Sequence, residues 1–302
     1  MIVQKRYFLR WLLEGANSSM QTNKILKNEV LKFEQVSIHY GSGIKALNNI
    51  SLRFIEGESV VICGPNGSGK TTLLKAAAGL LLAKEGRVFL ANEELNKKNR
   101  NNAFKKIGFL FQDSEDQLFC PTVREDVEYG PINQGLSVDG VKQRVEYAFH
   151  VMDLESLADR PIHHLSGGQK KRVALAGILA MQPSILVLDE PINGLDGQSS
   201  HELLKTLKHL NQDQGFTLIV VTHDLNSISQ FAKRMIILKE GRIFKDGPLR
   251  EVLTNIEALE EANIEPPIIT RYFYMKNKLN KEENKRLPVS IDEAIYMNPE
   301  LM

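Results

Sequence analysis

The chain has 302 residues, enough for one large domain or two with a substantial core. Its 38 lysines and arginines nearly balance 37 aspartates and glutamates, so no overall basic field argues for a nucleic-acid partner. Its two cysteines, Cys63 and Cys120, lack metal or disulfide spacing, and the longest apolar runs, such as 76–83 and 173–181, are far too short to span a bilayer. Any membrane role therefore requires a partner.

Residues 1–29 form an extension ahead of the first strand pattern. Lys5, Arg6 and Arg10 are mixed there with apolar and aromatic side chains, and Arg10 interrupts the apolar core that a signal peptide needs. A short amphipathic segment that binds a membrane surface or a partner is one interpretation. We favour a disordered extension, or a start placed too early with Met20 as the true start, because nothing in 14–28 has an ordered pattern.

Two β patterns follow, at 30–38 and 50–54, with apolar side chains in alternation. Tyr40 lies between them, just before a flexible loop. An aromatic ring at this position could stack on an adenine base, although a lone tyrosine here would more often simply end a strand.

The glycine-rich sequence GPNGSGKTT comes between an apolar strand pattern at 59–63 and a helix-forming run at 73–78. Its spacing fits the phosphate-binding P-loop, G-x-x-x-x-G-K-[ST]. Glycines let backbone N–H groups approach phosphate oxygens, and the helix N-terminus attracts the same anion. We expect Lys70 to reach the β- and γ-phosphates of ATP and Thr71 to bind Mg²⁺. The predicted nucleotide-binding residues of this loop are Gly64, Pro65, Asn66, Gly67, Ser68, Gly69, Lys70, Thr71 and Thr72.

A glycine-rich turn with no ligand would explain the P-loop spacing alone, so the motifs that follow decide between the two interpretations. A strand is predicted at 87–90, then a polar loop at 92–102, and then a buried strand at 106–111 that ends at Gln112. The acidic loop 113–116 comes next, and by itself it is typical of a solvated loop.

Helical patterns replace the strands from 122 to 182. We predict a short helix at 123–129 capped by Thr122, a longer helix at 138–152, and a turn or two at 154–158. These elements indicate a helical insertion that interrupts an α/β domain.

The sequence LSGGQ at 165–169 begins another helix, because Ser166 and Gln169 have the spacing of a capping box. Gly167 and Gly168 in its first turn destabilise the helix by about 1 kcal/mol each relative to alanine. Glycine is reasonable there if the helix end presses its N–H groups against an anion. Because the P-loop already covers one face of the phosphates, this second anion site predicts a head-to-tail dimer with two nucleotides at the interface.

A buried strand pattern at 184–188 ends in two carboxylates, Asp189 and Glu190. Ligands of open α/β sheets bind at the carboxyl ends of the strands. Asp189 is therefore expected to hold Mg²⁺ through water, and Glu190 to orient or deprotonate the attacking water. A helix-capping acidic pair is the weaker alternative, because the strand lies downstream of a P-loop in the usual order.

The α/β pattern continues to the end of the domain. We predict a helix at 198–211, a strand at 217–221, a helix at 225–231 and strands at 235–239 and 242–245. The tail from 248 is predicted to be mainly helical, with breaks at the prolines of 266–267 and at Pro288.

Taken in order, Tyr40, GPNGSGKT, Gln112, LSGGQ, ILVLDEP, 194–196 and His223 resemble the nucleotide-binding subunit of ATP-binding cassette (ABC) transporters over residues 30–245. The resemblance implies an α/β P-loop NTPase fold. It would consist of an extension at 1–29, an ABC ATPase domain at 30–247 and a C-terminal helical dimerisation tail at 248–302. The domain would include an antiparallel β subdomain and a helical subdomain at about 122–182.

The same resemblance implies roles for single residues. Tyr40 would stack on adenine, Gln112 would sense the γ-phosphate and the membrane partner, and Asp196 would bridge two protomers. The implied catalytic residues are Glu190, His223, Lys70 and Gln112, the implied Mg²⁺ ligands are Thr71, Gln112 and Asp189, and the remaining nucleotide contacts are Ser166, Gly167, Gly168, Gln169 and Asp196. The family more often has threonine where this chain has Ile192, which removes one hydroxyl.

A narrower similarity is carried by residues 111–131 and 262–273, which look like the ATPase of energy-coupling-factor importers, especially the cobalt/nickel branch. In that family the segment after Gln112 faces the coupling helices of a transmembrane subunit, and the tail helps two ATPases to dimerise. The acidic loop 113–116 would then belong to the docking surface. His163 and His164 flank the LSGGQ helix, where packing or exposure is a commoner explanation than nickel binding.

The resemblance implies an ATP- and Mg²⁺-dependent motor subunit, peripheral to the cytoplasmic side of the cell membrane. Its partners would be a transmembrane coupling subunit, a substrate-binding membrane subunit and a second ATPase, either another copy or a paralogue. Two alternatives stay open: transport of a vitamin such as biotin or another small molecule, and a non-transport ABC ATPase acting on nucleic acid or ribosomes. The single cassette, without a long coiled coil or a basic stripe, argues against the last.

Overall fold

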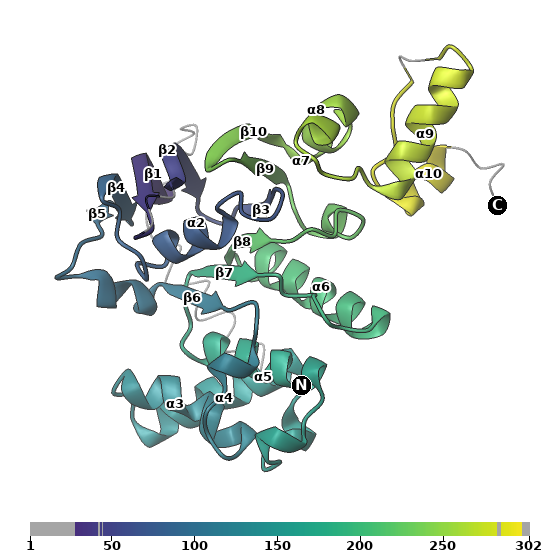
Figure 1. Cartoon of the computed structure of the whole chain (residues 1–302). Helices are drawn as coiled ribbons and strands as arrows, with labels where there is room; N and C mark the ends of the chain where they lie inside the picture. Colours follow the sequence, from purple (N-terminus) through teal and green to yellow (C-terminus); the bar gives the residue numbers. More distant parts are fainter. Residues whose placement is uncertain (1–27, 42, 44, 283–284, 298–302) are drawn as a thin grey trace, which may run out of the picture.

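The structure, a computed structural model, describes residues 28–41, 43, 45–282 and 285–297 (Figure 1). Strand β1 begins at Glu29, and the rest of the predicted extension, 1–27, lies outside the described residues. The predicted antiparallel subdomain is a four-stranded sheet in the order β2-β1-β4-β5. Its strands are β1 (Glu29–His39), β2 (Lys45–Ile55), β4 (Glu85–Leu90) and β5 (Glu93–Glu94).

A six-stranded sheet in the order β10-β9-β3-β8-β7-β6 forms the centre of the molecule. Its pairs are parallel except for the antiparallel β9–β10 pair. The strands are β3 (Ser59–Cys63), β6 (Ile107–Leu110), β7 (Ile185–Asp189), β8 (Thr217–Val221), β9 (Arg234–Lys239) and β10 (Arg242–Pro248). The predicted strands are thereby confirmed, and β10 runs three residues beyond its predicted end at Lys245.

Successive residues of the central strands face two different hydrophobic cores. Val60 and Ile62 of β3 belong to the core shared with the antiparallel sheet and helix α2 (Lys70–Ala77). Val61 and Cys63 belong to the core under the larger helices. Because side chains alternate between the faces of a strand, a strand buried on both faces reads as a continuous apolar run. Strand β3 is therefore buried in the middle of the sheet, and the P-loop follows its carboxyl end.

The predicted helical insertion packs as one group on the far side of the sheet from the antiparallel strands (Figure 1). It contains α3 (Val123–Asn133), α4 (Val138–Met152) and α5 (Gly167–Ala180), and α6 (Gly197–Gln212) follows β7. Short 3₁₀ turns occupy Arg100–Lys105, Glu115–Gln117, Glu155–Leu157 and Ile162–His164. The predicted bounds of α4 are confirmed.

Helix α3 is longer than the predicted 123–129. Its start is as expected, because Thr122 and Glu125 form a capping box. It continues through Gly130 and Pro131, residues that usually stop a helix. A Cβ at Gly130 would lie 2.6 Å from Cγ of Met181, so the glycine is needed for close packing against the end of α5. Tertiary packing therefore overrides the local stop signal.

The helix predicted at 225–231 is wrong, since the structure has only a 3₁₀ turn at Ile228–Gln230. The Asp224 carboxylate accepts hydrogen bonds from the Asn226 N–H (3.0 Å) and the Ser227 hydroxyl (2.7 Å). These local bonds offer the backbone an alternative to an α-helix. The segment therefore turns directly into β9.

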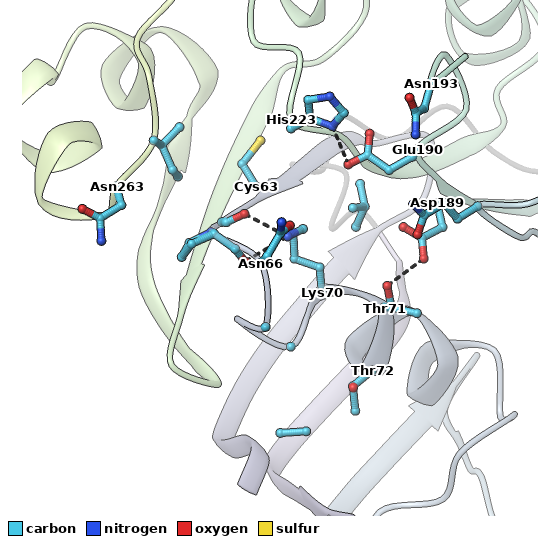
Figure 2. Close-up of a pocket in the computed structure, with 18 of the residues that line it drawn as sticks. Cys63, Asn66, Lys70, Thr71, Thr72, Asp189, Glu190, Asn193, His223 and Asn263 are labelled. Atoms are coloured by element: carbon cyan, nitrogen blue, oxygen red, sulfur yellow. Dashed lines mark hydrogen bonds and ion pairs between the residues drawn. The ribbon is translucent and has the colours of Figure 1, made fainter. Parts of the chain in front are cut away.

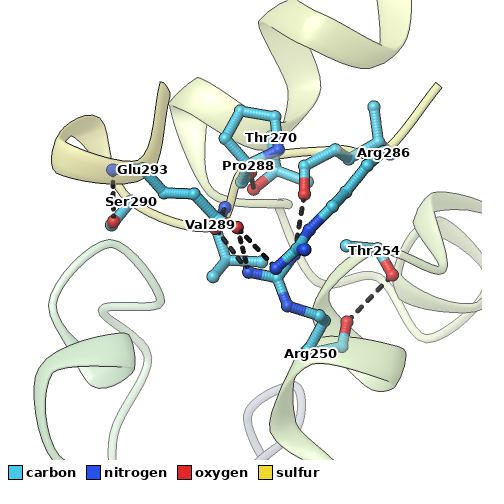
Figure 3. A network of polar contacts seen from close by, with 9 residues as sticks. Arg250, Thr254, Thr270, Arg286, Pro288, Val289, Ser290 and Glu293 are labelled. Atoms are coloured by element: carbon cyan, nitrogen blue, oxygen red, sulfur yellow. Dashed lines mark hydrogen bonds and ion pairs between the residues drawn. The ribbon is translucent and has the colours of Figure 1, made fainter. Parts of the chain in front are cut away.

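The predicted helical tail contains α7 (Leu249–Leu253), α8 (Ile256–Glu261), α9 (Ile268–Leu279) and α10 (Ile291–Met297). Its predicted breaks at 266–267 and at Pro288 are confirmed. Glu293 of α10 accepts hydrogen bonds from Arg250 of α7, from Arg286 (3.0 Å) and from the Val289 N–H (3.0 Å) (Figure 3). We call this group the tail clasp, because it joins the two ends of the tail.

Candidate nucleotide-binding site

A cleft of about 950 Å³ opens at the carboxyl ends of β3 and β7 (Figure 2). It brings together most of the predicted site residues from five separate stretches of the chain: Tyr40, Gly64, Pro65, Asn66, Gly67, Gly69, Lys70, Thr71, Thr72, Gln112, Asp189, Glu190 and His223. Ser68 is buried and does not line the cleft.

The three P-loop positions require glycine for different structural reasons. A Cβ at Gly64 would lie 2.2 Å from the Leu238 carbonyl oxygen, and one at Gly69 would lie 2.4 Å from the Ala46 carbonyl oxygen. A Cβ at Gly67 would meet no described atom within 4 Å, but Gly67 has a left-handed φ of 78°. Gly64 and Gly69 thus let neighbouring strands approach, whereas Gly67 leaves open backbone toward the cleft.

Lys70 and helix α2 provide the positive charge of the cleft. The Lys70 ammonium donates to the carbonyl oxygens of Gly64 (2.8 Å) and Pro65 (3.1 Å), so it lies inside the curve of the loop. Helix α2 begins after Gly69 with no side-chain cap, which leaves its first N–H groups available to an anion. A phosphate chain fits this arrangement of donors.

Thr71 and Asp189 form the oxygen-rich side of the cleft. The Thr71 hydroxyl donates to the Asp189 carboxylate over 2.9 Å. Burial raises the pKa of Asp189, and the Thr71 hydrogen bond and the charge of Lys70 oppose that change. A hydroxyl beside a carboxylate is the kind of oxygen donor set that Mg²⁺ prefers, so the residues present fit this ion.

Glu190 and His223 approach each other across the cleft. His223 Nδ1 lies 3.0 Å from Glu190 Oε1, and the Glu190 side chain is only 10% exposed. The other carboxylate oxygen, Oε2, is buried and has no hydrogen-bond partner among the described residues. Glu190 also has a left-handed φ of 50°, which is uncommon for a residue with a side chain. One oxygen of Glu190 is therefore held by His223, while the other is buried without a protein partner among the described residues.

Two further predicted residues border the cleft. The Tyr40 hydroxyl lies 3.2 Å from the Thr72 hydroxyl, and its side chain stays half-exposed. Gln112 lines both this cleft and a second one of about 530 Å³, which the acidic loop 113–116 and Gly167 also line. Gln112 therefore sits between the P-loop and the acidic loop.

The LSGGQ residues do not line the P-loop cleft. The predicted capping box is confirmed, with Ser166 accepting from the Gln169 N–H (3.3 Å) and Gln169 accepting from the Ser166 N–H (3.0 Å). A Cβ at Gly167 would meet no described atom within 4 Å. This chain alone therefore gives no packing reason for a glycine at this helix end.

Asp196 also lies away from the P-loop cleft, at the start of α6. It accepts hydrogen bonds from the Ser199 N–H (2.9 Å) and the Ser199 hydroxyl (2.8 Å), and these bonds lower its pKa. Asp196 is therefore a charged helix cap at the surface of the chain. His163 and His164 are exposed too, and their rings pack edge to face at 4.2 Å.

Tail residues that the sequence analysis missed also line the cleft, namely 263–265 after α8. Asn263 has a left-handed φ of 55°, and Lys239 of β9 donates to the Glu261 carbonyl (2.8 Å). Asparagine after a helix predicts a turn, but no local signal tells which surface that turn will face. Lys45, Ala46 and Asn193 are further lining residues that the sequence analysis did not single out.

A second contact joins the tail to the loop that follows His223. The Asn226 side-chain oxygen accepts from the Ile268 N–H (3.0 Å) at the start of α9, and the Asn226 N–H donates to Asp224. The tail thus touches the cleft directly and also through this loop. Within the described ranges, no helix combines the length and the apolar character needed to cross a membrane.

Comparison with known proteins gives consistent results. A family model described as ABC transporter matches residues 47–193. The energy-coupling factor transporter ATP-binding protein EcfA of Methanococcus maripaludis is 40% identical over 254 residues, which cover 83% of this chain and 91% of that protein. The solved structure of cbiO1 from Clostridium perfringens, described as part of the ABC transporter complex cbiONQ, superposes with a TM-score of 0.72 at 35% identity. It covers 83% of this chain and 100% of its own.

A second similar structure is an ATP-binding cassette solved as a dimer in a post-hydrolysis state with ADP and Pi. It has a TM-score of 0.66 and 35% identity, and the match covers 73% of this chain and 99% of that one.

Proposed function

We propose that this chain, which belongs to the ABC transporter ATPases, drives the import of cobalt or nickel ions. Within that family it is an ATP-binding subunit of the energy-coupling-factor type. ATP hydrolysis coupled to transport follows from the family. The observation that carries the site is the Glu190–His223 pair beside the P-loop, at a distance of 3.0 Å. Support for the metal branch comes from the resemblance carried by residues 111–131 and 262–273.

We assign the chemistry to residues of the cleft. Glu190 takes the proton of the attacking water, while His223 orients the carboxylate and reaches the γ-phosphate. Lys70 and the N–H groups of α2 stabilise the negative charge of the phosphates. Thr71, Asp189 and Gln112 would hold Mg²⁺, which when bound neutralises the β- and γ-phosphate oxygens.

The LSGGQ helix completes the site in trans in this proposal. Gly167 has no packing reason among the described residues, and the N-terminus of its helix attracts anions. A second ATPase, another copy or a paralogue, would bring this end to the nucleotide on the first P-loop. Asp196 then lies near the interface, where it would bridge the protomers.

We place the docking surface for the transmembrane coupling subunit beside the acidic loop 113–116. Phe119, 63% exposed, packs edge to face on Tyr129 with ring centroids 4.6 Å apart. An exposed aromatic pair next to carboxylates suits a helix that carries apolar and basic side chains. The chain would be a peripheral subunit on the cytoplasmic side of the cell membrane, and a membrane partner would supply the substrate site.

The test is uptake of radiolabelled nickel and cobalt by the native cells, with wild-type protein and with Lys70→Ala. Lys70→Ala removes the ammonium inside the P-loop, so it should abolish tight ATP binding and metal uptake together. Lys142→Ala is a matched control, because Lys142 forms only an exposed pair with Glu146. Unchanged metal uptake in Lys70→Ala would contradict the metal proposal and direct the assay to biotin and other vitamins.

A further inference from the structure

Lys171 is a buried cation on the LSGGQ helix α5, just 5% exposed. Its ammonium donates to two main-chain oxygens, those of Asn193 (2.6 Å) and Glu190 (3.4 Å). Among the described residues Lys171 makes no ion pair within 4.0 Å. The preceding residue, Lys170, by contrast pairs with Glu115 at 2.8 Å. A buried ammonium is expensive to desolvate unless its donors are satisfied, so these two carbonyls determine its position.

The two carbonyls belong to the turn that presents the Glu190 carboxylate. The Glu190 carbonyl also accepts from the Asn193 N–H (3.2 Å), and the Glu190 N–H donates to Val221 of β8 (2.9 Å). Glu190 has its left-handed φ of 50° inside this set of bonds. Such a conformation in a residue with a side chain persists only where its surroundings hold it. The Glu190 N–H is thus bound by Val221 of β8, and the Glu190 carbonyl oxygen is bound by the Lys171 ammonium.

We propose that Lys171 is a positioning residue for ATP hydrolysis, which fixes the backbone of Glu190 and Asn193 so that the Glu190 carboxylate faces the water beside His223. This inference rests on the proposed role of Glu190 as the base. In this proposal Lys171 acts on Glu190 through main-chain oxygens. It also ties the reacting carboxylate to the helix that carries Gly167 and Gly168 to the partner's nucleotide.

The charges around Lys171 agree with this role. Burial lowers the pKa of Lys171, whereas the carboxylates of Asp113 and Glu190 raise it. The same lysine lines the second cleft together with Asp113, Asn193 and Gly167. Movement of α5 relative to β7 would therefore displace the turn at 190–193 directly, because one ammonium joins the two elements.

The alternative is that Lys171 only anchors α5 in the fold. Loss of a structural anchor lowers the melting temperature and reduces ATP binding and turnover together. Loss of a positioning contact lowers kcat while KM for ATP stays unchanged, because the interaction matters in the transition state. A charge-assisted hydrogen bond of this kind corresponds to about tenfold to a hundredfold in kcat.

The test compares purified wild-type protein with Lys171→Met, Lys171→Arg and the control Lys170→Met, by ATPase kinetics and thermal unfolding. Lys171→Met should lose at least about tenfold in kcat, with KM within about twofold and an almost unchanged melting temperature. Lys171→Arg should recover most of the rate, because Lys171 borders a cleft of about 530 Å³ that can take a guanidinium. Lys170→Met should match the wild type.

Normal kcat in a folded Lys171→Met protein would overturn the inference, and so would a parallel loss of kcat and ATP affinity. Should Lys171→Met not fold, Lys171→Gln must show the same isolated fall in kcat. Glu190→Gln separates the two proposals. An active Glu190→Gln would mean that the base assignment is wrong, whereas an inactive Glu190→Gln beside a fully active Lys171→Met would refute only the role of Lys171.

Discussion

Glycine has three distinct roles around the nucleotide cleft, and they can be separated residue by residue. Gly64 and Gly69 are required because the carbonyls of Leu238 and Ala46 occupy the space of a side chain. Gly67 is required by its left-handed backbone. Gly167 is required by neither, since it is helical and open to solvent. The sequence pattern singles out all four, but only the structure tells which are needed for the fold of one chain.

Substitution of Gly167 by alanine tests this distinction. Alanine favours a helix over glycine by about 1 kcal/mol, so Gly167→Ala should keep or slightly raise the melting temperature. ATP binding to the P-loop should be unchanged, while ATPase activity falls by more than tenfold because a methyl group enters the proposed contact with the second nucleotide. Gly140→Ala, in the first turn of α4 and outside the proposed interface, is the control. Full activity of Gly167→Ala would contradict the contact in trans.

At the scale of elements, burial made the central strands predictable, whereas the end of α3 and the segment 225–231 were mispredicted. Strands β3, β7 and β8 are buried on both faces and read as apolar runs, so their positions follow from the sequence. The end of α3 and the failure of the helix at 225–231 depend on contacts with Met181 and on side-chain bonds of Asp224. The Met181 contact is long-range and has no local pattern. The Asp224 bonds are local, but the apolar pattern of 225–231 outweighed the turn preference of Asp224 in the prediction.

The tail clasp predicts a pH-dependent stability at the same scale. Burial raises the pKa of Glu293, but hydrogen bonds from Arg250 and the Val289 N–H, with the charges of Arg250 and Arg286, lower it overall. A lowered folded pKa means that the clasp stabilises the tail above the ordinary glutamate value of about 4.3, and that this stabilisation is lost as pH falls through the folded value.

Glu293→Gln should therefore weaken α10 at neutral pH by about 1–2 kcal/mol, a range discounted for the partial exposure of Arg250. Hydrogen exchange of the α10 amides measures this change. The difference from wild type should shrink as the pH falls below the ordinary glutamate value and through the lowered pKa of folded Glu293, because Glu293 is then protonated in both states. Glu282→Gln is the control, because the Glu282 carboxylate forms a surface pair with Lys285. A difference that is constant over this pH range would contradict the assignment.

At the scale of the whole molecule, helix α9 presents an apolar stripe on its exposed face. Ile268, Tyr272, Met275 and Leu279 recur at helical spacing, with Leu279 84% exposed. The family resemblance assigns dimerisation to this tail, and an apolar stripe is suited to that purpose. The sequence predicted the tail and its helices, whereas its contribution to the cleft at 263–265 emerged only from the fold.

A charge in this stripe should weaken association without unfolding the subunit. Leu279→Asp is expected to shift the monomer–dimer equilibrium toward monomer by at least tenfold, measured by sedimentation without nucleotide, because one charge would be buried in the contact. Val138→Asp is the control, since Val138 is equally exposed but lies on α4, outside the tail. Dimers of unchanged affinity in Leu279→Asp would show that the tail stripe has another partner.

The hydrogen bond from the Ile268 N–H to Asn226 connects the tail to the loop beside the phosphate site, so exchange of this amide proton can report on that site. That amide proton is held by a loop whose other end carries His223, so its exchange with solvent should slow when nucleotide orders the loop. The Ala258 amide, held by Asn255 in the same tail at 2.9 Å, has no such connection and should keep its rate. Deuterium uptake at these two positions, with and without ATP in the Glu190→Gln protein, would show whether a signal leaves the cleft through the tail as well as through the membrane partner.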